Sequence, residues 1–210
     1  MQWTLVVPLK ALARAKSRLS DTAADGLRPG LALAFAQDTV AAALACSEVA
    51  DVAVVTGDAL AGRELAALGA RIIRDEPGGG LNAALRHAAA AVRAARPRTP
   101  LAALNADLPA LRPPELARVL LAAGEFPRAF LPDAAGFGTT LLAASPGREL
   151  LPAFGADSRA RHRASGAAEI LPPSVDSVRQ DVDTGTDLLA ALALGVGPRT
   201  ASAVERLRAA

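Results

Sequence analysis

An apolar strand gives way to a basic loop in the sequence Val6-Val7-Pro8-Leu9-Lys10-Ala11-Leu12-Ala13-Arg14-Ala15-Lys16-Ser17-Arg18-Leu19. The apolar run that leads into it, from Trp3 to Val7, is typical of a buried first strand. Lys10 and Lys16 are the only lysines of the chain, since all its other basic residues are arginines. A positive loop at the carboxyl end of a first parallel strand is a place where α/β proteins bind phosphates. The loop therefore favours phosphate binding over its alternative, an ordinary solvated basic loop.

The composition of the whole chain predicts one domain over residues 1–210, with a helical tail from about residue 197 to the end. Hydrophobic residues make up 51% of the 210 residues, but aromatic residues only 3%. Because single-stranded nucleic acid is bound by stacking on exposed aromatics, that composition argues against a nucleic-acid partner. A single cysteine, Cys46, excludes a disulfide framework. No apolar stretch is typical of a signal peptide or a membrane span, so we expect a cytoplasmic protein, monomeric or homodimeric.

Strand and helix patterns alternate along the first two thirds of the chain. Apolar runs predict strands over 3–7, 49–56, 71–74, 100–104, 129–131, 139–143 and 169–171. Helical patterns occupy 29–46, 59–68, 81–95, 113–123, 158–164 and 186–194. Connections of helical length call for a mostly parallel sheet with helices on both faces, a three-layer α/β sandwich. The short link at 133–138 predicts one antiparallel excursion.

Carboxylates follow two distant segments of this pattern. Asp107 comes directly after the strand that ends near residue 104, where open α/β sheets bind ligands, although a lone aspartate there can equally be a turn residue. Asp181 and Asp183 alternate with Val182, which predicts one strand face carrying both carboxylates. Asp107 and Asp183 together would suit a Mg²⁺ ion that also binds phosphate oxygens. Thr186 or Asp187 is expected to cap the helix that follows.

Two glycine-rich segments are candidate binding loops. Gly79, Gly80 and Asn82 precede or open a helix, where backbone N–H groups can approach a nucleotide and the amide can contact a base or ribose. The alternative is a flexible loop with Asn82 in the first helical turn. Small hydroxyl residues beside glycines, at Thr140 and at Gly155 to Ser158, suit a small anionic group, although Ser158 can also be a helix N-cap. The two histidines, His87 and His162, show no metal-ligand spacing and are expected at a helix surface and in an arginine-rich turn.

Taken together, these motifs resemble the CofC/FbiD family of guanylyltransferases in coenzyme F-420 biosynthesis, which are related to the MobA-like nucleotidyltransferases. The resemblance rests on Val-Pro-Leu-Lys, Ala-Lys-Ser-Arg-Leu, Gly-Leu-Asn-x-Ala-Leu, Ala-Asp-Leu-Pro, Gly-x-x-Ser and Asp-Val-Asp-Thr-x-x-Asp-Leu, in that order. It covers essentially Met1 to Gly195. The usual glycine-rich opening of the nucleotidyltransferases is replaced here by Pro8-Leu9-Lys10-Ala11, as it is in this family.

The resemblance implies a Rossmann-like fold of the GT-A type and transfer of GMP from GTP to a phosphorylated three-carbon acid, with release of diphosphate. The acid is phosphoenolpyruvate in the bacterial branch and 2-phospho-L-lactate in the archaeal branch. The family's phosphoenolpyruvate contacts fall on Thr140, Gly155 and Ser158, and its metal carboxylates on Asp107 and Asp183, with Asp181 as an alternative to the latter. Lys10, Lys16 and Arg18 are then expected to bind the triphosphate. A molybdenum-cofactor nucleotidyltransferase and a nucleotide-sensing module without turnover are the competing hypotheses.

Overall fold

A computed structural model describes residues 1–12, 28–75 and 79–209 of the chain. Its strands are β1 (Trp3–Leu9), β2 (Val49–Thr56), β3 (Arg71–Arg74), β4 (Leu101–Leu104), β5 (Arg128–Pro132), β6 (Thr139–Ala144) and β7 (Ala168–Glu169). Its helices are α1 (Arg28–Leu44), α2 (Ala59–Ala67), α3 (Gly80–Ala95), α4 (Pro113–Ala123), α5 (Ser158–Ala164), α6 (Asp176–Arg179), α7 (Gly185–Leu194) and α8 (Pro198–Ala209). Most of these elements match the ranges expected from the sequence within two residues.

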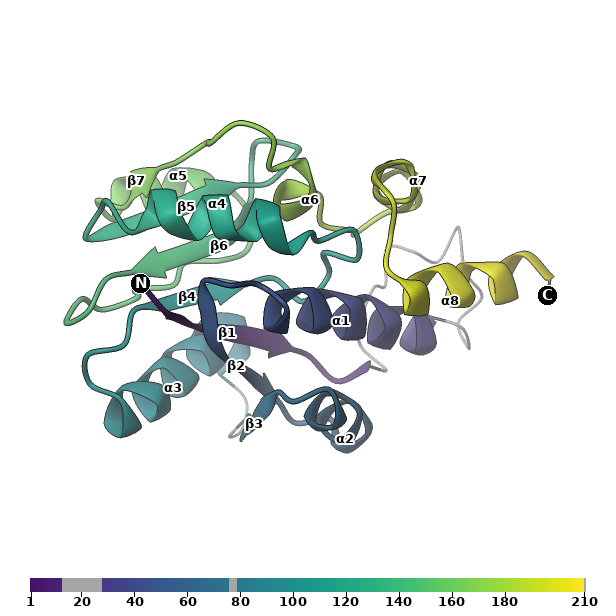
Figure 1. The fold of residues 1–210 in the computed structure, drawn as a ribbon, viewed down its shortest axis with the longest axis horizontal. Helices are drawn as coiled ribbons and strands as arrows, with labels where there is room; N and C mark the ends of the chain where they lie inside the picture. Colours follow the sequence, from purple (N-terminus) through teal and green to yellow (C-terminus); the bar gives the residue numbers. More distant parts are fainter. Residues whose placement is uncertain (13–27, 76–78, 210) are drawn as a thin grey trace.

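The strands form one sheet in the order β3-β2-β1-β4-β6-β5-β7 (Figure 1). The pairs β1–β2, β1–β4, β2–β3 and β5–β7 are parallel. β6 runs antiparallel to both of its neighbours, β4 and β5. The mostly parallel sheet with an antiparallel excursion is therefore confirmed.

Helices cover both faces of the sheet, which explains why its central strands are continuous apolar runs. On one face, Leu5 and Val7 of β1 belong to a core that also contains residues of α1, α2 and α4. On the other face, Val6 belongs to a core with Leu85 and Val92 of α3. Successive residues of β1 thus enter opposite cores, and the three-layer arrangement is confirmed.

The expected strand at Asp181 and Asp183 is wrong. The chain forms the short helix α6 at Asp176–Arg179 and then passes through 181–183 without joining the sheet. The backbone of this segment contacts the turn after β4, because the N–H of Val182 donates a hydrogen bond to the carbonyl of Asp107 at 3.1 Å. The alternation still has its expected effect, because Val182 is fully buried and both aspartates remain on the opposite side.

Two smaller expectations also need correction. The strand predicted over 169–171 is β7, which pairs with β5 only at Ala168 and Glu169; Pro172 and Pro173 follow and cannot donate to a ladder. The N-cap of α7 is Thr184 rather than Thr186 or Asp187. Thr184 and Asp187 form a capping box, in which each side chain accepts a hydrogen bond from the other residue's backbone N–H.

The last helix, α8, lies along α1 (Figure 1). The buried carboxylate of Asp38 in α1 accepts the backbone N–H groups of Arg199 and Thr200 at the start of α8, at 3.2 and 2.7 Å. A side chain at Gly197 would meet that carboxylate, since an added Cβ would lie 2.4 Å from Asp38 Cγ. No helix in the described part of the chain is both long and apolar enough to cross a membrane.

Candidate active site

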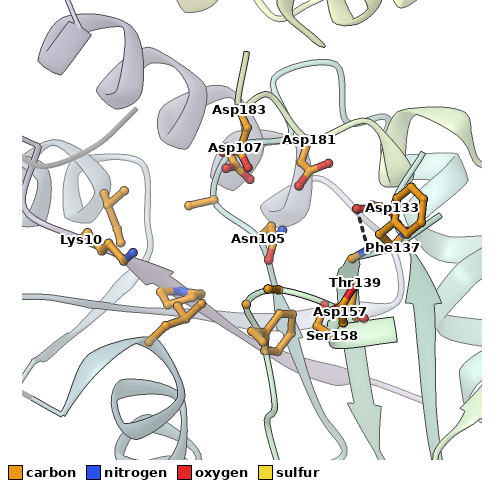
Figure 2. A pocket seen from close by; sticks show the side chains of 18 of the residues that line it. Lys10, Asn105, Asp107, Asp133, Phe137, Thr139, Asp157, Ser158, Asp181 and Asp183 are labelled. Atoms are coloured by element: carbon orange, nitrogen blue, oxygen red, sulfur yellow. Dashed lines mark hydrogen bonds between the residues drawn. The ribbon is translucent and has the colours of Figure 1, made fainter. Parts of the chain in front are cut away.

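A cavity of about 660 Å³ opens at the carboxyl edge of the sheet, between β1 and β4. The strand order changes direction there, because the chain builds β2 and β3 on one side of β1 before β4 returns to the other side. Such a switch point leaves a crevice in which α/β proteins bind ligands. Figure 2 shows side chains from three regions facing this space: Lys10 after β1, three aspartates along one wall, and Thr139 and Ser158 on another.

The aspartate wall consists of Asp107, Asp181 and Asp183, all of which line the cavity. Asp107 lies in the turn after β4, and the hydrogen bond from Val182 N–H to its carbonyl brings the other two aspartates beside it. The sequence prediction that Asp107 and Asp183 meet from distant parts of the chain is therefore supported by their shared wall.

A buried threonine of α1 fixes the Asp107 turn. The Oγ1 atom of Thr39 accepts the N–H of Leu108 at 3.0 Å, and it lies 2.8 Å from the carbonyl of Phe35 and 3.2 Å from that of Ala106. Thr39 thus contacts the residues on both sides of Asp107 in the sequence. Sequence reasoning missed this residue, because a single threonine in an alanine-rich helix carries no signal of a contact 69 residues away.

The aspartate wall fits a magnesium ion whose other ligands are substrate phosphates and water. Among residues 1–12, 28–75 and 79–209, no three acidic, histidine or cysteine side chains converge to form a complete metal site. Mg²⁺ does not need one, since it keeps several waters and binds through one or two carboxylates plus substrate phosphates. The oxygen donors of Asp107 and Asp183 match that preference.

Of the three expected triphosphate contacts, Lys10 lines the cavity, while Lys16 and Arg18 lie outside the described residues. The chain between β1 and that segment is anchored by Asp58, whose carboxylate accepts the N–H of Leu12 at 2.9 Å. The same carboxylate caps α2 through the N–H groups of Leu60 and Ala61. These hydrogen bonds, that from Leu12 foremost, lower the pKa of Asp58 below its ordinary value.

The expected nucleotide loop lies beside Lys10. Gly80 and Leu81 line a smaller hollow of about 70 Å³ that Lys10 and Asp75 also border. Gly79 has no room for a side chain, since an added Cβ would lie 2.4 Å from Ala83 Cβ.

Asn82 has a role that the sequence did not reveal. Its Oδ1 accepts the N–H of Phe154 at 2.8 Å, and its Nδ2 donates to the carbonyl of the same residue at 3.0 Å. The amide therefore anchors the loop at 153–158, and its contact with a base or ribose stays a prediction.

The wall opposite the aspartates carries two of the three expected acceptor residues. Gly155 and Ser158 line the cavity, and Gly155 adopts a φ of +114° that favours glycine. Thr140 is fully buried with its Oγ1 unpaired among the described residues, and the neighbouring Thr139 is the threonine that lines the cavity. A register shift between β5 and β6 near this point disturbs the simple alternation from which side-chain directions are inferred.

His162 lies in the core behind this wall, and the expectation of a histidine in an arginine-rich turn is wrong. It belongs to α5, is 0% exposed, and packs its ring against Phe130 and Phe154. Burial, together with the charges of Arg128 and Arg161, lowers the pKa of His162 to about 4. The ring is therefore neutral at physiological pH.

The loop between β5 and β6 is held by Asp133. Its carboxylate accepts the backbone N–H groups of Gly136, Phe137 and Gly138 at 2.6, 3.0 and 2.8 Å. Arg159 adds a hydrogen bond to the carbonyl of Gly136 at 2.8 Å. The loop thereby presents Phe137, whose side chain is 72% exposed, at the edge of the cavity (Figure 2).

Comparison with known proteins agrees with this geometry. Residues 34–171 match the family model of the MobA-like NTP transferase domain. The chain is also 81% identical, over 99% of its length and 98% of the relative's, to the phosphoenolpyruvate guanylyltransferase of Streptomyces coelicolor. The chain belongs to the CofC/FbiD family of MobA-like nucleotidyltransferases. The family resemblance seen in the motifs is confirmed, and this CofC/FbiD protein is a nucleotidyltransferase.

Solved structures share the fold of this CofC/FbiD protein. A nucleotidyl transferase from Methanothermobacter thermautotroptrophicus, 24% identical, matches with a TM-score of 0.65 over 90% of this chain and 95% of that one. Rv0371c from Mycobacterium tuberculosis, solved in complex with manganese, is 23% identical and matches with a TM-score of 0.57 over 92% of this chain and 99% of that one. The expected GT-A-type fold is confirmed.

Proposed function

We propose that the protein transfers GMP from GTP to the phosphate of phosphoenolpyruvate, giving enolpyruvoyl-2-diphospho-5′-guanosine and diphosphate, in coenzyme F-420 biosynthesis. The observation that carries this proposal is one cavity in which a carboxylate wall and Lys10 face a wall of small hydroxyl and glycine residues. The carboxylate wall, through a Mg²⁺ ion, and Lys10 suit a nucleoside triphosphate. The wall of hydroxyl and glycine residues suits a small anionic acceptor. The name of the Streptomyces coelicolor relative supports the choice of both substrates.

The chemistry asks the protein mainly for positioning and charge neutralisation. An oxygen of the acceptor phosphate attacks the α-phosphorus of GTP, the new P–O bond forms, and the bond between the α-phosphorus and the bridging oxygen to the β-phosphate breaks. The leaving group is diphosphate, which takes the electron pair. No general base is required, because the attacking phosphate is already an anion at neutral pH.

The residues of the proposed site divide these tasks between them. Lys10 stabilises the triphosphate and the leaving diphosphate, with Lys16 and Arg18 proposed for the same role. Asp107 and Asp183 would hold Mg²⁺, which supplies neutralisation of the phosphate charges when bound. Gly79, Gly80 and Asn82, near Lys10, are the proposed nucleotide-binding residues. Gly155 and Ser158 are the proposed acceptor-binding residues, and Thr139 rather than the buried Thr140 is the threonine of that wall.

The test is diphosphate release from GTP and Mg²⁺ with one of three acceptors: phosphoenolpyruvate, 2-phospho-L-lactate or a pterin of the molybdenum cofactor. We expect release with phosphoenolpyruvate. Release with phospholactate alone would reassign the acceptor, and release with the pterin alone would reassign the enzyme. GTP binding without release for any acceptor would indicate a nucleotide-sensing module.

A further inference from the structure

A buried hydrogen-bond chain connects the backbone of the 153–158 loop to a hydroxyl in the cavity wall. The N–H of Ala153 lies 3.0 Å from Nε2 of His162, and Nδ1 of the same ring lies 2.9 Å from Oγ1 of Thr139. His162 is 0% exposed and Thr139 is 3% exposed, so both are shielded from bulk water. Thr139 also lines the cavity, as does Ser158, and Figure 2 labels both.

The direction of each hydrogen bond in this chain follows from elementary chemistry. A backbone N–H can only donate, so Nε2 of His162 must accept and carries no proton. A neutral imidazole carries one proton, which must then lie on Nδ1. The lowered pKa of His162 agrees with this neutral form. Nδ1–H therefore donates to Thr139, and Thr139 Oγ1 must accept.

This direction leaves the proton of the Thr139 hydroxyl for another acceptor. Within the described part of the chain, His162 is the one hydrogen-bond partner of that hydroxyl. A buried hydroxyl with its proton uncommitted and its side chain in a cavity wall is a directed donor toward a ligand oxygen.

The wall around Thr139 offers further hydrogen-bond donors to a ligand oxygen, although it also carries the carboxylate of Asp157. Ser158, 2% exposed, adds a second hydroxyl to the same wall. The guanidinium of Arg161 lies over Gly155, with Nη2 3.2 Å from the position that a Cβ would take. The nearby carboxylate of Asp133 already accepts three backbone N–H groups, which offset its charge.

We propose that Thr139 donates a hydrogen bond to an anionic oxygen of the three-carbon acceptor, and that His162 is the positioning residue that imposes this direction. The nature of the acceptor rests on the proposed function. His162 also fixes the loop that carries Gly155 and Ser158, through Ala153, so that a single buried ring organises both parts of the acceptor wall.

Two matched pairs of variants test the proposal. Thr139→Val removes the hydroxyl at nearly constant shape, whereas Thr139→Ser keeps it. His162→Gln can place an acceptor near the Nε2 position but loses the Nδ1 donor, whereas His162→Asn can keep a donor near Nδ1 and loses the Nε2 acceptor. His87→Asn, at an exposed position of α3, is the control for loss of a histidine.

We expect Thr139→Val to raise the KM for phosphoenolpyruvate about 10- to 100-fold, the range for a hydrogen bond to a charged group, with the KM for GTP unchanged. Thr139→Ser should restore most of the affinity. His162→Gln should raise the same KM, and the double variant Thr139→Val/His162→Gln should be no worse than Thr139→Val, because the two residues act through one bond. His162→Asn should lower the melting temperature, because the N–H of Ala153 loses its acceptor. It should raise the acceptor KM less than His162→Gln does, because it can keep the donor to Thr139.

Specific outcomes would overturn the proposal. An unchanged acceptor KM in Thr139→Val refutes the donor, and additive effects in the double variant refute the positioning role of His162. Equal increases in the KM values for GTP and acceptor would indicate general damage to the cavity. If the wild type turns over no acceptor, the proposed function fails, and calorimetric titration of wild type and Thr139→Val with phosphoenolpyruvate still tests the donor. Equal binding by both, or binding by neither, refutes it.

Discussion

Replacing Thr39 by valine should weaken both the fold and the catalysis, because this buried hydroxyl fixes the turn that carries Asp107. Threonine and valine have the same shape and similar helix propensities, so the change removes little except hydrogen bonds. The N–H of Leu108, a residue 0% exposed, then loses its acceptor. Leaving one buried donor unsatisfied costs about 1–3 kcal/mol. For a chain of this length, about 2 kcal/mol lowers the melting temperature by about 4–8 °C.

The catalytic consequence follows from the position of Asp107 between the two residues that Thr39 contacts. A displacement of about 1 Å at a catalytic group can cost about 100-fold in rate, so we expect kcat in Thr39→Val to fall at least about tenfold. Thr39→Ser keeps the hydroxyl and is the matched control. Its free energy of unfolding should fall by less than about 1 kcal/mol, because it loses only one methyl group. Thermal unfolding and diphosphate release measure the two effects. A lower melting temperature with unchanged kcat would show that the turn does not depend on Thr39, and an unchanged melting temperature would refute the hydrogen-bond argument itself.

Three further predictions concern other parts of the chain. Asp107→Asn should reduce diphosphate release at least about 100-fold with an unchanged circular dichroism spectrum, because a metal carboxylate contributes several kcal/mol of charge stabilisation; normal turnover would remove it from the metal site. Asp58→Ala should lower the free energy of unfolding by about 1 kcal/mol. Because the folded-state pKa of Asp58 is lowered, this difference between wild type and variant should be complete above about pH 4 and should shrink as the pH falls further. A pH-independent difference in unfolding free energy would contradict that assignment. Gly197→Ala should lower the free energy of unfolding by about 2 kcal/mol, because the added Cβ is forced against Asp38. The control Gly30→Ala, where an added Cβ has no atom within 4 Å, should not destabilise the protein. Equal melting temperatures of the two variants would refute the packing argument.

Much of the fold could be predicted from the sequence because its parallel strands are buried on both faces. Such strands appear as continuous apolar runs, and the strand β2 at Val49–Thr56 has the predicted limits. The segment at Asp181 and Asp183 could not be placed correctly from its pattern. Alternation of polar and apolar residues indicates an extended chain with one buried side, but it cannot distinguish a sheet strand from a segment that makes a single backbone bond to Asp107.

The candidate site was predictable where its residues follow strand ends. Lys10 and Asp107 come directly after β1 and β4, and the topology alone brings parallel strand ends to one edge. Thr39, Thr139 and His162 could not be found in this way, since their roles depend on contacts between residues far apart in the chain. His162, placed among arginines in α5, resembles a surface residue until the helix is seen to bury it against two phenylalanines.

The two walls of the cavity are held by separate sets of buried hydrogen bonds, and this separation has a kinetic consequence. Thr39 and the backbone of Val182 fix the aspartate wall, whereas His162 and Asn82 fix the loop that bears Gly155 and Ser158. None of the hydrogen bonds in one set shares a residue with the other, so perturbations of the two walls should combine additively. Damage to the aspartate wall should lower kcat, because charge neutralisation matters most in the transition state, and damage to the acceptor wall should raise the KM of the acceptor. The same separation would allow the acceptor side to change its ligand while the phosphoryl-transfer side keeps its geometry.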